Sequence, residues 1–144
     1  MFLGEYQHSL DTKGRLVLPR KFRDELSDGL VVTKGQENCL YVFTFDRFQE
    51  EMARVNRLPR TDGRARKLAR SFFPGASNQQ LDKQGRIQIP DKLRNFASLE
   101  KDVAVVGVAD RIEIWATDEW ETVQEEADQY YSEIEDALSS EGGI

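Results

Sequence analysis

The sequence predicts an α+β protein built from two copies of one unit, which pack together as a single pseudo-symmetric body. Residues 4–23 match residues 75–94 at an offset of 71, and eight of the 20 aligned positions are identical. Residues 33–48 match residues 105–120 at an offset of 72. Repetition on this scale indicates a duplicated structural unit. Because a unit of about 45 residues rarely buries an adequate core alone, we expect the copies to share one.

Each copy opens with a strand, a tight turn and a second strand. Apolar and polar residues alternate through Tyr6, His8 and Leu10, and again through Leu16 and Leu18, on either side of the turn DTKGR. The second copy repeats this pattern around the turn DKQGR. Alternation with period two is typical of strands, so the pattern predicts a β-hairpin at each turn.

Glycine and aspartate are predicted to shape both turns. We expect Gly14 and Gly85 to adopt the positive φ that a tight turn needs. Asp11 and Asp82 are expected to accept hydrogen bonds from backbone amides inside their turns.

Short helices and buried strands follow each turn. Pro19 and Pro90 each begin a segment suited to one or two helical turns, because proline is tolerated at the first helical position. The apolar runs LVVTK and CLYVF in the first copy, and VAVVG and RIEIW in the second, predict buried strands.

A longer helix is predicted to end each copy. Asp46 with Gln49, and Asp118 with Glu121, have the spacing of a capping box at a helix start. Helical spacing also predicts which apolar side chains pack on the core. In the first copy these are Phe48, Met52 and Val55, followed by a second helical stretch over 64–73 with Leu68 and Phe72 on one side; in the second copy they are Trp120, Val123 and Ala127.

These patterns divide the chain into four segments. The first unit is predicted over 5–47 and a helical linker over 48–75. The second unit is predicted over 76–119, and an acidic C-terminal helix and tail over 120–144.

Composition excludes several functional classes. No apolar run approaches the roughly 20 residues that cross a bilayer, and the N-terminus lacks the features of a secretory signal, so we expect a cytoplasmic protein without membrane contact. Cys39 is the only cysteine and His8 the only histidine, which leaves no disulfide, no Cys/His metal site and no catalytic triad within one chain. We therefore expect no enzyme activity, cofactor or metal. Cys39 is predicted to be a buried small hydrophobe, and His8 an ordinary strand residue.

The net charge of −6 combines opposite blocks along the chain. Residues 54–70 carry seven basic side chains and one acidic one, and the first 23 residues carry five basic and two acidic. Residues 118–141 carry ten acidic side chains and no basic one. Such an end is by default a solvated helix that fades into a disordered tail. Alternatively, it repels DNA from all but the basic edge, or pairs with basic residues of a neighbouring subunit.

The candidate functional site is the pair of turns at 11–15 and 82–86. A glycine turn that ends in arginine holds a guanidinium at a rigid strand start, where it can form bidentate bonds to phosphate or guanine. The competing interpretation is that Arg15 only pairs with Asp11 across the turn. The candidate DNA contacts are Lys13, Arg15, Arg20, Lys21, Arg23 and Arg86.

The first copy is predicted to be the better DNA-facing half. The second copy has Gln84 where the first has Lys13, and Asp91 where the first has Arg20. The basic block at 54–70 is a second positive surface, but charge runs of this kind are usually solvated faces.

Three segments together resemble the MraZ family over residues 1 to about 120. They are the opening MFLGEYQHSLDTKGRLVLPRKFR, the central FFPGASNQQLDKQGRIQIPDKLR and the later VVGVADRIEIW. The resemblance implies two tandem SpoVT-AbrB units of the swapped-hairpin β-barrel kind, with both halves intertwined. The family's D-x-x-x-R turn corresponds to Asp11 and Arg15, and to Asp82 and Arg86.

The resemblance also implies a function. Members of the family are sequence-specific transcriptional regulators, mostly repressors, of their own gene and of the division and cell wall gene cluster. The implied partners are double-stranded DNA with short direct repeats and further copies of the chain in a ring-shaped homo-oligomer, and the implied location is the nucleoid.

Two alternatives remain open at this point. An antitoxin-like module similar to MazE would bind DNA through the turns and a toxin through the acidic segment, although such antitoxins carry one copy of the unit and dimerise. A ring-forming scaffold without DNA affinity would suit the net charge of −6 better.

Overall fold

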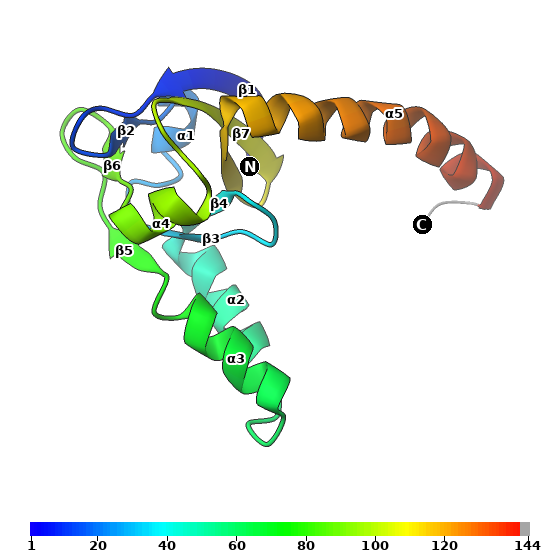
Figure 1. Cartoon of the computed structure of the whole chain (residues 1–144), viewed down its shortest axis with the longest axis horizontal. Helices are drawn as coiled ribbons and strands as arrows, with labels where there is room; N and C mark the ends of the chain where they lie inside the picture. Colours follow the sequence, from blue (N-terminus) through cyan, green and yellow to red (C-terminus); the bar gives the residue numbers. More distant parts are fainter. Residues whose placement is uncertain (142–144) are drawn as a thin grey trace.

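The computed structural model describes residues 1–141, with side-chain burial given for residues 1–134 (Figure 1). The last residues of the predicted acidic tail, 142–144, lie outside the described residues. The strands are β1 (Phe2–Ser9), β2 (Arg15–Val17), β3 (Leu30–Lys34), β4 (Leu40–Thr44), β5 (Ser77–Gln79), β6 (Arg86–Gln88), β7 (Asp102–Ala109) and β8 (Ile112–Ala116). The helices are α1 (Arg20–Arg23), α2 (Phe45–Asn56), α3 (Gly63–Phe72), α4 (Asp91–Phe96) and α5 (Thr117–Glu141). The predicted α+β class is confirmed.

The strands of the two copies interlock. The larger sheet has the order β1-β7-β8-β4-β3-β5, and β2 and β6 form a second, two-stranded sheet. Strand β1 of the first copy pairs with β7 of the second, and β5 of the second copy pairs with β3 of the first. All of these ladders are antiparallel. The copies therefore exchange strands, as the family resemblance implies.

The prediction of a local hairpin at each turn is wrong. Strand β1 does not form a ladder with β2, nor β5 with β6, among the paired strands of the described chain. Period-two alternation shows which face of a strand is buried but not which strand lies beside it. Here β1 gains an eight-residue ladder with β7, and the three residues of β2 pair with β6 instead.

A pseudo-two-fold axis passes through two of the ladders. In the β2–β6 ladder Leu16 is opposite Ile87, which is its own equivalent at the offset of 71. In the β4–β8 ladder Tyr41 is opposite Glu113, its equivalent at the offset of 72. Each copy thus meets the other through the same residues, which confirms the pseudo-symmetric packing of two units.

One core draws almost equally on both copies. Its fully buried side chains include Leu16, Leu18, Phe22, Val32, Val42, Ile87, Ile89, Leu93, Val105 and Ile114. The short helices α1 and α4 each contribute one side chain to it, Phe22 and Leu93. Pro19 and Pro90 precede these helices as N-cap residues, one position earlier than predicted.

The outer face of the larger sheet is covered by the helices that follow each copy. Over the first copy, Phe48 of α2 and Phe72 of α3 pack on Val31 and Phe43. Over the second, Trp120 and Val123 of α5 pack on a cluster around Trp115 that contains Cys39. Cys39 is 1% exposed and burial raises its pKa to about 12, so the prediction of a small buried hydrophobe is confirmed.

Four details of the predicted helices are wrong, the first being Leu68, which was predicted to pack on the core but is 39% exposed. The N-cap of α2 is Thr44, whose hydroxyl accepts a hydrogen bond from the Arg47 amide at 3.1 Å, so Asp46 lies within the first turn. Asp118 likewise lies inside the first turn of α5, where an acidic side chain complements the helix dipole without capping it. Ala127 is exposed, because α5 packs on the sheet through Trp120 and Val123 near its start and then runs out from the body (Figure 1).

We expect the two copies to unfold in one cooperative transition. Leu16→Ala and Ile87→Ala should each lower the free energy of unfolding by about 2–5 kcal/mol, because each removes a fully buried side chain on the pseudo-two-fold axis. Val17→Ala, at a position 37% exposed, is the matched control and should cost less than about 0.5 kcal/mol. Urea unfolding followed by circular dichroism measures the change, and two separate transitions in calorimetry would contradict a shared core.

Candidate nucleic-acid interface

The two turns have the same hydrogen-bond geometry. In the first, Asp11 Oδ1 accepts from the amides of Lys13 and Arg15 at 2.9 and 2.8 Å, and Oδ2 accepts from Arg15 Nε at 2.7 Å. In the second, Asp82 makes the equivalent bonds to the Gln84 and Arg86 amides and to Arg86 Nε at 2.9, 2.8 and 2.7 Å. The predicted role of both aspartates within the turns is confirmed.

Both aspartates are ionised at neutral pH. The backbone hydrogen bond from Arg15 is the main cause that holds the pKa of Asp11 below its ordinary value, and the bond from Arg86 does the same for Asp82. Each carboxylate therefore keeps its arginine partner at neutral pH. An exposed pair of this kind adds little stability, but it fixes the direction of the guanidinium.

The aspartate uses only one side of each guanidinium. Among the described residues, the hydrogen bonds of the Arg15 and Arg86 side chains involve Nε alone. Their side chains are 32% and 24% exposed. The terminal nitrogens thus remain available to another partner, so the pairing of Arg15 with Asp11 does not preclude a contact with DNA.

Each turn is held in place by the other copy. The Gly14 carbonyl accepts a hydrogen bond from the Ile89 amide at 2.8 Å, and the Gly85 carbonyl accepts one from the Leu18 amide at 3.0 Å. Both glycines have φ of +75°, which confirms the predicted positive φ. These bonds across the pseudo-two-fold axis place the two turns together at the end of the molecule opposite α5 (Figure 1).

An arginine from the other copy packs beneath each turn. The guanidinium of Arg94 in α4 lies against Gly14, and that of Arg23 in α1 lies against Gly85. Arg23 is half-buried and its Nε donates to the Leu18 carbonyl at 3.0 Å. Arg23 therefore braces the second turn, and its suggested contact with DNA stays a prediction.

The exposed basic residues of the first copy do not all lie at the first turn. Lys13 lies in the first turn, whereas Arg20 and Lys21 are exposed on α1. Because Arg23 of this helix touches the second turn, α1 adjoins the turn of the other copy. The first copy's cations are thus divided between the two turns instead of forming one DNA-facing half.

Sequence reasoning missed Lys83. This residue is exposed in the second turn, one position earlier in the turn than Lys13 is in the first. Comparison of the copies at aligned positions detects the loss of a lysine at Gln84 but not its replacement by the neighbouring Lys83. Counting cations over the whole turn would have found it.

The remaining charged features lie elsewhere. The basic block at 54–70 is on the α2–α3 arm, away from the turns (Figure 1). His8 is in β1, as predicted, and burial lowers its pKa, with a smaller contribution from Arg23, so it adds no positive charge at neutral pH.

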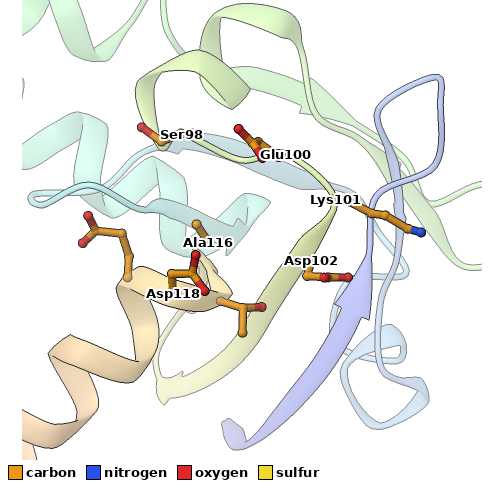
Figure 2. Close-up of a pocket in the computed structure, with 8 residues that line it drawn as sticks. Ser98, Glu100, Lys101, Asp102, Ala116 and Asp118 are labelled. Atoms are coloured by element: carbon orange, nitrogen blue, oxygen red, sulfur yellow. The ribbon is translucent and has the colours of Figure 1, made fainter.

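An acidic cavity of about 370 Å³ lies at the base of α5. Glu100, Asp102 and Asp118 line it, but their carboxylates do not point toward a common centre (Figure 2). Asp102 instead accepts a hydrogen bond from Ser9 at 3.3 Å. Among the described residues, no cluster of His, Cys, Asp and Glu could hold a metal ion, and no helix is long and apolar enough to span a membrane.

We expect both turns to require glycine. Gly14→Ala and Gly85→Ala should each lower the free energy of unfolding by at least about 1–2 kcal/mol, because alanine disfavours the left-handed conformation and its Cβ would meet the bracing arginine. Gly63→Ala is the matched control: it lies in α3 with the nearest atom 3.6 Å from the added Cβ, and should be neutral or slightly stabilising. If urea unfolding gives equal stabilities for Gly14→Ala and Gly63→Ala, the turn does not depend on that conformation.

Comparison with known proteins places the whole chain in one family. The model of the MraZ protein family, described as antitoxin-like, matches at residues 1–71 and again at 72–139. The transcriptional regulator MraZ of Alkaliphilus metalliredigens (strain QYMF) is 46% identical over 142 residues, which cover 99% of both chains. Those of Finegoldia magna (strain ATCC 29328 / DSM 20472 / WAL 2508) and Natranaerobius thermophilus (strain ATCC BAA-1301 / DSM 18059 / JW/NM-WN-LF) are 43% and 42% identical. The match to the Finegoldia protein covers 96% of this chain and 97% of that protein, and the match to the Natranaerobius protein covers 96% of both. The chain therefore belongs to the MraZ family.

Proposed function

We propose that this protein regulates transcription by binding double-stranded DNA with the end of the molecule that carries the two turns. The observation that carries the proposal is the pair of identically built turns, locked together, each with an arginine whose terminal nitrogens are open. A single turn of this kind could be explained by its role in the local structure alone. Two of them, fixed relative to each other by cross-copy hydrogen bonds, offer a rigid double contact to one DNA groove.

The side chains at this end divide into two kinds. Arg15 and Arg86 are oriented by their aspartates and suit bidentate contacts to guanine or to phosphate. The exposed side chains of Lys13, Lys83 and, on α1, Arg20 and Lys21 suit phosphate contacts, which supply affinity without sequence preference. These six cations outnumber the two turn carboxylates, Asp11 and Asp82, even though the chain as a whole is negative.

The finer parts of the proposal follow the family resemblance. The DNA would be short direct repeats upstream of the protein's own gene, and binding would repress that gene and the division and cell wall cluster. The protein would act in the cytoplasm at the nucleoid, as a homo-oligomer without a catalytic role. The four segments predicted from the sequence stay a prediction at the level of their boundaries.

The antitoxin-like alternative shares the DNA contact and differs in the partner of the acidic segment. The description of the family as antitoxin-like keeps it as the second candidate. A scaffold without DNA affinity is the third, and DNA binding distinguishes it from the other two.

Arg15→Ala should weaken binding to the upstream DNA by roughly 5- to 150-fold, the loss of about 1–3 kcal/mol expected for one bidentate base contact. Arg86→Ala should act similarly, and Lys13→Ala should reduce the slope of log affinity against log salt by about 1. Fluorescence anisotropy at several salt concentrations measures both effects. Arg54→Ala, on α2 and paired with Glu51, removes a positive charge far from the turns and should leave binding unchanged.

The variant Asp11→Asn tests whether Arg15 contacts DNA or only stabilises the turn. Asparagine keeps the Oδ1 acceptor for the amides of the turn but loses the partner of Arg15 Nε. Arg15 then stays charged and near its place, so binding should fall far less than in Arg15→Ala. Equal losses in the two variants would mean that Arg15 only braces the turn. If the wild type has no affinity for DNA at low salt, the regulator proposal fails and the scaffold remains.

A further inference from the structure

The two turns are built alike inside, but the first also has a side chain of the other copy bound to its backbone. The Nε2 atom of Gln88 in β6 donates a hydrogen bond to the Lys13 carbonyl at 2.7 Å. The Lys13 amide is already bound to Asp11. Both backbone groups of this lysine are therefore held, one from inside the turn and one from the other copy.

The second turn has no equivalent of this bond. At the offset of 71, the equivalent of Gln88 is Val17 and the equivalent of Lys13 is Gln84. The side chain of Val17 has no hydrogen-bond donor. Among the described residues, no hydrogen bond reaches the Gln84 carbonyl. The pseudo-symmetry of the two copies is therefore broken at this contact.

A second glutamine fixes the backbone of Gln88. The Oε1 atom of Gln79, at the end of β5, accepts a hydrogen bond from the Gln88 amide at 2.7 Å, and its Nε2 donates one to the Gln88 carbonyl at 2.8 Å. The same Nε2 bonds the Ser77 hydroxyl at 3.1 Å. The side-chain amide of Gln79 thus takes the place of a neighbouring strand along the free edge of β6. In the first copy this position is His8, which makes no such pair with Val17 among the described side chains.

Gln88 is also the residue opposite Arg15 in the β2–β6 ladder. The backbone groups of both residues point away from the ladder, those of Arg15 to Asp11 and those of Gln88 to Gln79. Non-hydrogen-bonded pairs of this kind bring the two opposite side chains close together on one face. The position of Arg15, like that of Lys13, is therefore tied to Gln88.

These bonds act on the two cations that the proposed function assigns to the first turn. Ordering a loop or a side chain during binding costs affinity, and a group that is ordered beforehand avoids that cost. The first turn is held by its own aspartate and by Gln88, whereas the second turn lacks the bond from the opposite strand. The second turn consequently loses more conformational freedom when it binds.

We propose that Gln79 and Gln88 are positioning residues for the contact of the first turn with DNA. Gln79 fixes the backbone of Gln88. Gln88 in turn fixes Lys13 through its carbonyl and Arg15 through the ladder. The two turns are thus unequal: the first binds in the conformation that it already has, and the second adjusts. This inference rests on the proposed function, and it assigns to Gln79, which is half-buried, no contact with the DNA itself.

A double-mutant cycle with the two turn arginines tests the proposal. Gln88→Val gives β6 the residue that β2 has at the equivalent place, and should weaken DNA binding roughly 3- to 10-fold, the effect of one lost hydrogen bond. This loss should persist in the Arg86→Ala background. In the Arg15→Ala background it should shrink to at most about 1.5-fold, because Gln88 acts through the first turn. Fluorescence anisotropy with a duplex of the upstream DNA at low salt measures all of these affinities.

Gln79→Leu tests the preceding step. Leucine has a similar size but cannot bond the Gln88 backbone, so binding should weaken although this side chain does not touch DNA. Hydrogen exchange measured by mass spectrometry without DNA should show that residues 13–15 become less protected relative to residues 84–86, in this variant and in Gln88→Val. The matched control is Gln7→Val, which removes an exposed strand glutamine that bonds Thr117 at 3.0 Å at the start of α5, and it should change neither measurement.

The outcomes distinguish this inference from the proposed function. Equal losses from Gln88→Val in the Arg15→Ala and Arg86→Ala backgrounds would indicate a direct contact or a general loss of stability, and would overturn the positioning role. Unchanged affinity in both glutamine variants of a chain that binds DNA would overturn it as well. A wild type without affinity for DNA would instead remove the proposed function, and the positioning role with it. Circular dichroism checks that every variant is folded.

Discussion

The backbone hydrogen bonds from Leu18 to Gly85 and from Ile89 to Gly14 connect each turn to the strand of the other copy. The short β2–β6 ladder lies between these bonds, and its central pair, Leu16 and Ile87, is fully buried. An isolated copy would lack a partner for β1, for β2 and for the carbonyl of its turn glycine. The exchange of strands therefore gives two small units one core, and it fixes the distance and orientation of the two turns.

This arrangement would favour the proposed binding of DNA, because turns that are already fixed lose little further conformational entropy when they bind. Arg23 and Arg94 lie against the turn glycines of the other copy, while Asp11 and Asp82 orient Arg15 and Arg86 through their Nε atoms. Arginine is suited to this double role because its planar group can bond a carboxylate through one edge and another acceptor through the rest. A lysine at position 15 would supply the charge without the fixed direction.

The sequence was sufficient for the duplication, the core residues and the turn chemistry, because these depend on local pattern and on identities between the copies. It did not reveal the pairing of β1 with β7, since alternation marks a buried face and not a neighbour. The contact of Arg23 with Gly85 was not predicted for the same reason, since only the strand exchange brings the two residues together. Lys83 was overlooked because a one-position shift within a turn changes the alignment but hardly changes the surface charge.

The two copies differ most where they leave the shared body. The first ends in α2 and α3, which pack on the sheet through Phe48 and Phe72 and then extend away from the body, and the second ends in α5, which leaves the body in another direction (Figure 1). Identical arms on a pseudo-two-fold body would favour a symmetric contact that stops at a dimer, whereas unlike arms allow a contact that repeats. In the proposed homo-oligomer each pair of turns would need only weak affinity, because linked copies would engage spaced DNA repeats at a high effective concentration. Affinity for a promoter would then depend on the number and spacing of the repeats more steeply than on any single turn.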